Sequence, residues 1–159
     1  MITQAKNLAK ILVFQIDNQR YGLLAADVVE IERIVTLLPL PKAPNAIEGV
    51  VNYHGTLIPV LDIRARFGLP PKSIAHTEHL IIASAMQQLI AIRADSALEL
   101  IDLDVEALEE VTRDRHYLLG VAKLSDGLVL IHNLQSFLNE EESSALKQAL
   151  SDKNKSSAH

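Results

Sequence analysis

Short apolar runs separated by polar turns fill most of the chain, which predicts β-strands. KILVFQI at residues 10–16 is followed by a polar turn and by YGLL, the pattern of a β-hairpin. VVEIERI at 28–34 alternates apolar and charged residues, so we expect a half-buried strand there. TLLPLPKAP at 36–44 contains three prolines, which lack the amide that a central strand needs. We expect this segment to be an extended loop.

The segment GVVNYHGTLIPVLDI at residues 49–63 predicts two further strands around a turn at Gly55. DIRARFG at 62–68 then predicts one or two helical turns, because Asp62 can cap the start and Gly68 can end it. A polar linker, PPKSIAHTE at 70–78, follows. It divides the chain into two halves.

The second half repeats the pattern of the first. The pattern of residues 79–100 matches that of residues 11–31 when Glu99 is aligned with Glu30, an offset of 69 residues. GVAKLSDGLVLIHNL matches GVVNYHGTLIPVLDI when Gly120 is aligned with Gly49, an offset of 71. Each half therefore offers five short strands, and closing them into a small barrel removes the sheet edges that promote aggregation.

Two barrels of this size have thin cores, so we expect them to pack together and share one. The first barrel is expected at about residues 10–70 and the second at about 78–134, both within one domain at 8–140. LQSFLNEEESSALKQAL has apolar residues at helical spacing, which predicts a C-terminal helix at 135–151. Residues 152–159 are expected to be a disordered tail.

Composition excludes several classes of protein. The chain has 159 residues, a formal net charge of −5 and a pI near 5.6, which argues against nucleic acid as a partner. No cysteine is present, so disulfides and thiolate metal sites are excluded. The longest nearly apolar stretch, at 80–92, is interrupted by two glutamines and is too short to cross a bilayer. We expect a soluble cytoplasmic protein without membrane insertion.

A search for catalytic motifs finds none of the usual nucleotide-binding, zinc-protease or serine-hydrolase patterns. His76, Glu78 and His79 form a histidine-rich group in the linker, but no third strong ligand can be placed beside the two histidines. His132 follows an apolar strand and is expected to be a capping or packing residue. We predict no enzyme activity, no cofactor and no metal.

The doubled pattern, VVEI at 28–31, PLPKAP at 39–44 and above all EGVVNYHGTLIPVLDIRARFGL at 48–69 resemble the CheW-like domain. This family comprises adaptors that couple chemoreceptors to the histidine kinase CheA. The resemblance covers about residues 8–140. It implies a mainly β fold of two SH3-like five-stranded β-barrels with a short C-terminal helix, and a non-catalytic adaptor in a bacterial chemosensory signalling array.

The resemblance also implies partners and a site. Family members bind the regulatory domain of CheA through the first barrel, and the cytoplasmic hairpin tip of receptors in an apolar groove between the barrels. The positions of this chain that match the family near these contacts are Val28, Glu30, Gly49, Asn52, His54 and Gly55. Glu30 is expected to be exposed on its strand and to lie beside His54.

This chain departs from the family at one of those positions. The family usually has Asn-Leu-Arg-Gly where this chain has Asn52-Tyr53-His54-Gly55, so a permanent cation is replaced by an imidazole. We therefore keep open a CheW-like adaptor of a non-flagellar system, for twitching, biofilm or second-messenger control. A small metal-binding protein or enzyme built on His76, Glu78 and His79 is a weaker alternative.

Overall fold

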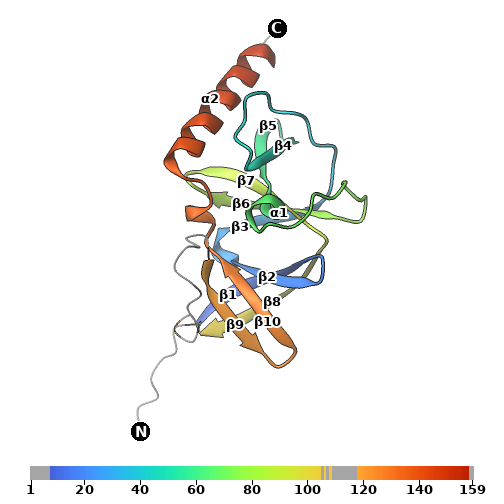
Figure 1. Cartoon of the computed structure of the whole chain (residues 1–159), viewed down its shortest axis with the longest axis vertical. Helices are drawn as coiled ribbons and strands as arrows, with labels where there is room; N and C mark the ends of the chain where they lie inside the picture. Colours follow the sequence, from blue (N-terminus) through green and yellow to red (C-terminus); the bar gives the residue numbers. More distant parts are fainter. Residues whose placement is uncertain (1–7, 105, 107, 109–117, 158–159) are drawn as a thin grey trace.

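The computed structural model describes residues 8–104, 106, 108 and 118–157. Its strands form two five-stranded sheets, one in each half of the elongated molecule (Figure 1). The sheet drawn below has the order β8-β1-β2-β10-β9 and is called the lower sheet here. The upper sheet has the order β3-β6-β7-β5-β4.

The strands have the following bounds. The lower sheet contains β1 (Leu8–Ile16), β2 (Gln19–Leu24), β8 (Ser96–Asp104), β9 (Leu118–Leu124) and β10 (Gly127–His132). The upper sheet contains β3 (Val28–Arg33), β4 (Ile47–Tyr53), β5 (Thr56–Leu61), β6 (His79–Ala85) and β7 (Gln88–Ala94). The five strands predicted for each half of the sequence are all present, and the mainly β fold is confirmed.

The predicted division into barrels at about 10–70 and 78–134 is wrong. The β1–β2 hairpin of the first half pairs with β8 and β10, and the β6–β7 hairpin of the second half pairs with β3 and β5. Each half thus gives its first hairpin to the sheet of the other half. The repeat makes the two sets of partners equivalent in sequence, so pattern alone cannot show which copy a hairpin joins.

The register confirms the repeat itself. Glu30 pairs with Ile82 between β3 and β6, and Glu99 pairs with Val13 between β8 and β1, so both partners are related by 69 residues. The parallel pair of Val60 and Ala91 likewise corresponds to that of Ile131 and Gly22. The molecule is therefore internally symmetric down to individual strand pairs.

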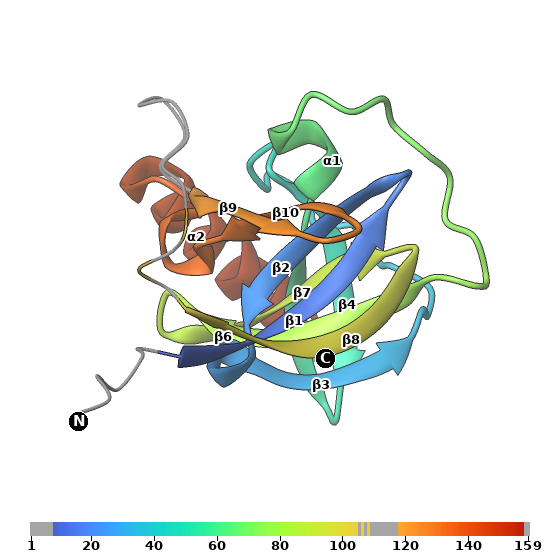
Figure 2. The same cartoon turned by 90° about the horizontal axis from the view of Figure 1, so that it is seen from below.

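The largest core cluster joins the two sheets. Leu12, Phe14 and Ile16 of β1 belong to it, and so do Ile81 and Ala83 of β6. The alternate residues of β1 and β6 face two smaller clusters, one within each sheet. Figure 2 shows the strands of the lower sheet lying in front of the upper sheet when the molecule is seen from below. The shared core predicted from the small size of the halves is confirmed.

Strand β3 is more exposed than its alternating sequence predicts. Val29 and Ile31 are 52% and 39% exposed, although they alternate with charged residues. The reason is that β3 is an edge strand of the upper sheet, so one of its sides has no neighbouring strand. The expectation of a half-buried strand fails for these two side chains.

Short helices and loops complete the fold. The 3-10 helix η1 (Ala25–Asp27) connects the lower sheet to β3, and α1 (Ile63–Arg66) follows β5. The Asp62 side chain accepts the N–H of Ala65 at 3.0 Å, which confirms the predicted cap. The loop at 36–44 has no strand, but Leu38 forms an isolated bridge with Val50 of β4.

The C-terminal helix is displaced from its predicted bounds of 135–151. After the 3-10 helix η3 (Leu134–Ser136), α2 runs over Glu140–Ser157. Asn139 and Glu142 exchange hydrogen bonds with each other's backbone N–H, a capping box that fixes its start. The expectation of a disordered tail is wrong for 152–157, because no glycine or proline ends the helix there. Residues 158–159 lie outside the described residues.

Candidate protein-binding site

The turn between β4 and β5 is built by two of the predicted site residues and their neighbour. His54 has a φ of 51° and Gly55 a φ of 86°, the left-handed pair that a tight two-residue hairpin turn requires. The Asn52 side chain accepts the N–H of Gly55 at 2.9 Å. Asn52 and Gly55 therefore hold the turn, which leaves the imidazole of His54 exposed at its tip.

Glu30 lies beside this turn. The hydroxyl of Tyr53 donates a hydrogen bond to Oε2 of Glu30 at 2.5 Å. β3 and β4 are the two edges of the upper sheet, so this bond joins strands that are four places apart in the sheet order. The bond to Glu30, the burial of the hydroxyl and the charges of Glu30 and Glu32 raise the pKa of Tyr53 to about 12.

The ligand atoms of Glu30, Glu32 and His54 lie within 4.8 Å of one another. The predicted proximity of Glu30 and His54 is thus confirmed. Glu32 was not singled out in the sequence, although it follows Glu30 by two residues and must share its face of the strand. Tyr53 was also missed, because nothing local indicates that its hydroxyl reaches across the sheet.

Two other predicted site residues have structural roles. Val28 is partly buried and packs against the large core cluster. Gly49 is buried, and a Cβ atom there would lie 2.6 Å from the carbonyl oxygen of Leu38. This glycine lets the proline-rich loop pack on β4 through the Leu38–Val50 bridge. The structure brings Glu30, Asn52, His54 and Gly55 together, whereas Val28 and Gly49 lie in the core.

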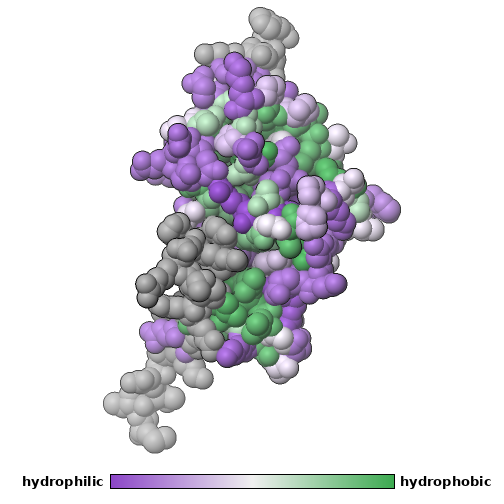
Figure 3. Space-filling view, viewed as in Figure 1, coloured by the Kyte–Doolittle hydropathy of each residue, from purple (hydrophilic) through white to green (hydrophobic). Residues whose placement is uncertain are grey.

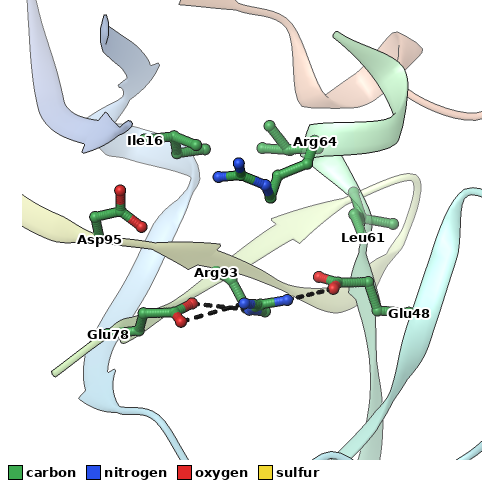
Figure 4. A pocket seen from close by; sticks show the side chains of 8 residues that line it. Ile16, Glu48, Leu61, Arg64, Glu78, Arg93 and Asp95 are labelled. Carbon is green, nitrogen blue, oxygen red and sulfur yellow. Dashed lines mark hydrogen bonds and ion pairs between the residues drawn. The ribbon is translucent and has the colours of Figure 1, made fainter. Parts of the chain in front are cut away.

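A buried ion network seals the corner of the upper sheet next to the linker (Figure 4). Arg93 of β7 donates from Nε to Glu78 at 2.8 Å and from Nη1 to Glu48 at 2.5 Å. The side chains of Arg93 and Glu78 are only 8% and 3% exposed. The cavity that remains among these groups holds about 10 Å³, too small for a ligand.

The two carboxylates of this network differ. Burial alone raises the pKa of each, but hydrogen bonds from Arg93 and from the N–H of Ala75 hold the pKa of Glu78 below its usual value. For Glu48 burial prevails over the attraction of Arg93, and its pKa is raised. Glu78 is thereby committed to Arg93, so the metal group suggested by His76, Glu78 and His79 does not form.

The corresponding corner of the lower sheet is open. It forms a groove of about 500 Å³ lined by Ala9, Lys10, Leu24, Ala25 and Ala26. The groove adjoins η1, where the chain passes from the lower sheet to the upper one. Apolar surface is also gathered on one face of the lower half of the molecule (Figure 3). Large exposed apolar side chains of the lower sheet are Leu8, Leu100, Leu119 and Leu128.

Two other expectations can be compared with the structure. His132 is buried and stacks on Phe67 with ring centroids 4.4 Å apart, so it is a packing residue, as predicted. Within the described residues no helix is long and apolar enough to span a membrane.

Comparison with known proteins identifies the family. The model of the CheW-like domain matches residues 10–142. The chemotaxis protein CheW of Klebsiella aerogenes is 25% identical over 136 residues, which cover 82% of each chain. That of Bacillus subtilis is 26% identical over 148 residues, covering 90% of this chain and 95% of the relative. Protein FrzA of Myxococcus xanthus is 27% identical over 100 residues, with 63% of this chain and 62% of the relative covered.

A solved structure agrees with these relatives. The scaffolding protein TtCheW from Thermoanaerobacter tengcongensis has a TM-score of 0.75 and 28% sequence identity, and the match covers 88% of this chain and 92% of that one. The fold, the family match and the relatives lead to one conclusion. The chain belongs to the CheW-like family, the non-catalytic adaptors that couple chemoreceptors to CheA in chemotaxis.

Proposed function

We propose that this adaptor uses two separate surfaces for its two partners. The surface around the β4–β5 turn, called the turn surface here, consists of Glu30, Asn52, His54 and Gly55 and binds the regulatory domain of a CheA-type kinase. The groove beside η1 binds the cytoplasmic hairpin tip of a chemoreceptor. Both assignments extend the family resemblance to particular residues of this chain.

The turn surface combines features of a protein interface. The exposed apolar side chains of Val29 and Ile31 flank Glu30 on an edge strand. Charged and polar groups at Glu30, Glu32 and His54 surround them. Apolar contact area with a polar rim supports binding to another folded domain, and the rim supplies specificity. This combination on one edge is the observation that carries the proposal.

The groove has a different character, which supports a different partner. Four of its five lining residues are apolar, and Lys10 is the only charged one. A receptor tip is a helical hairpin, and an amphipathic helix binds by laying apolar side chains in such a groove. The position of the groove at the junction of the two sheets agrees with the place that the family resemblance implies.

The location and output of the system are also proposals. We propose that the protein works in the cytoplasm, at membrane-bound receptor arrays. His54 in place of the usual arginine favours an array whose kinase accepts a weaker donor than a guanidinium. A non-flagellar system is the second candidate on this ground.

The turn surface can be tested by measuring binding to the CheA-type kinase of the same genome. Glu30→Ala removes one exposed carboxylate, so the free energy of unfolding should change by less than about 0.5 kcal/mol. Binding should weaken by about 1–2 kcal/mol, or more if Glu30 is a hot spot. His54→Arg should strengthen or redirect binding to kinases and receptors of the main family type.

The matched control is Glu99→Ala, because Glu99 occupies the equivalent position of the lower sheet and is also exposed. It should leave kinase binding unchanged. Equal losses of binding in both variants, or equal losses of stability and binding in Glu30→Ala, would contradict the assignment of the turn surface.

A further inference from the structure

Three side chains that metal ions commonly use meet at the edge of the upper sheet. Glu30 and Glu32 lie two residues apart on β3, and His54 reaches them from the β4–β5 turn. One nitrogen and two carboxylate oxygens lie within 4.8 Å of one another. No other group of three or more histidine, aspartate or glutamate side chains among the described residues meets this distance.

The charge of this group is uncompensated. Neither Glu30 nor Glu32 forms an ion pair among the described residues, whereas Glu48, Glu78 and Glu142 all do. The nearest donor to Glu30 is the neutral hydroxyl of Tyr53. The raised pKa of Tyr53 reflects the same negative field, to which both glutamates contribute. A cation at this position would neutralise two like charges that share one strand face.

The positions of the donors are partly fixed before any ion binds. The backbone of His54 is held in the left-handed turn, and its ring makes an edge contact with Tyr53 at a centroid distance of 4.4 Å. Tyr53 in turn holds Oε2 of Glu30 and leaves Oε1 of that carboxylate available. An outer-shell hydrogen bond of this kind orients a metal ligand.

We propose that Glu30, Glu32 and His54 bind one divalent first-row transition-metal ion, with Zn²⁺ as the representative. An imidazole with two carboxylates suits zinc better than calcium or magnesium, which prefer oxygen ligands alone. Bonds of about 2.0–2.2 Å to zinc bring ligand atoms closer than 4.8 Å, and rotation of the exposed glutamate side chains supplies the change. Three protein ligands leave a fourth position open.

The lower sheet provides an internal comparison. The symmetry places Glu99, Ile101 and Ser125 at the positions of Glu30, Glu32 and His54. The same backbone geometry thus carries only one ligand of the three in the lower sheet. The donor set is a property of the side chains at the upper edge, not a consequence of the fold.

Calorimetric titration of the untagged full-length protein with ZnCl₂ tests the site directly. We expect saturable binding of one Zn²⁺ per chain and a change in the imidazole NMR resonances of His54. His54→Asn is the decisive variant, because asparagine tolerates the left-handed backbone but removes the imidazole. Glu32→Gln removes a charged ligand without changing the size of the side chain.

Loss of an outer-shell group costs metal affinity about 10- to 100-fold, so both ligand variants should lose at least that much. Tyr53→Phe should have a smaller effect, and His76→Ala in the linker should have none. Absence of saturable binding in the unaltered protein would overturn the proposal, as would unchanged affinity in His54→Asn. The titration uses no partner protein, so its outcome is independent of the kinase and receptor assignments.

Discussion

Two equivalent corners of this molecule have the same backbone and opposite surfaces. In the upper sheet, Arg93 lies opposite Leu80 and is held by Glu78 and Glu48. In the lower sheet, the equivalent of Arg93 is Leu24, which lies opposite Ile11. The equivalents of Glu78 and Glu48 are Ala9 and Leu119. One corner is closed by ion pairs, and the other is an open apolar groove.

The difference shows how an internally repeated fold can separate stability from binding. A buried ion network contributes little net stability over apolar packing, but it fixes one arrangement of its partners. Here it ties the linker to the upper sheet, since Arg93 also donates to the backbone carbonyl of Lys72. The corner without the network keeps accessible apolar surface, which a partner can cover.

The largest expected effect is that of Arg93→Ala. This change leaves Glu78 buried without its cation, and breaking a buried pair in this way costs about 3–5 kcal/mol of the free energy of unfolding. Chemical denaturation measures the loss.

The control restores the pattern of the lower corner. In the triple variant Arg93→Leu, Glu78→Ala and Glu48→Leu, the three residues match Leu24, Ala9 and Leu119. It should recover much of the stability lost by Arg93→Ala, because no buried charge is left unpaired. A triple variant as unstable as the single one would show that the two corners are not equivalent.

A smaller effect is expected for Glu78→Gln, and it should depend on pH. The pKa of Glu78 is lowered in the folded protein, so its charge stabilises the fold above the unfolded-state value of about 4.3. Loss of the charged hydrogen bonds should cost about 1.5–3 kcal/mol at pH 7.

This stabilisation is lost as the pH falls through the folded-state pKa. The difference in unfolding free energy between the unaltered protein and Glu78→Gln should therefore shrink below about pH 4. Denaturation curves at a series of pH values measure it. A difference that stays constant into acid would mean that the charge of Glu78 does not contribute.

The smallest expected effect on the protein itself, with a clear effect on binding, is that of Ala26→Arg at the lip of the lower groove. Ala26 is exposed, so stability should change by less than about 0.5 kcal/mol. The cation would be buried against the receptor tip, and affinity should fall about tenfold or more. Kinase binding should be unaffected, because the turn surface is separate.

Leu128→Arg is the matched control for this variant. It introduces the same charge on the lower sheet beside Gln19, at the opposite end of β2 from the groove. Receptor affinity should remain unchanged in this variant. If both arginines weaken binding equally, the effect comes from net charge and not from the groove.

Much of the fold could be predicted from the sequence because the strands are marked locally. Alternation, turn residues and the cap at Asp62 place nearly every element, and the repeat offsets of 69 and 71 residues agree with the observed registers. The exchange of hairpins could not be predicted. Both copies of a strand offer similar apolar faces, and only the packed molecule distinguishes them.

The site was predictable to a lesser degree. Glu30 and His54 stand out because a charge on an apolar strand and an imidazole in a tight turn are unusual. Tyr53 and Glu32 join them only through the closing of one sheet edge onto the other. Gly49 was identified as a site residue, but it is required for the close approach of Leu38. The pairing of Arg93 with Glu78 depends on the linker, which has no pattern of its own.

The exchange of hairpins also has a consequence for synthesis of the chain. When β1 and β2 leave the ribosome, their sheet still lacks β8, β9 and β10, which follow about 70 residues or more later. A two-stranded hairpin is only marginally stable alone. Neither sheet can therefore be completed by the first half of the chain, and the amino-terminal strands must wait, exposed, until most of the protein has been made.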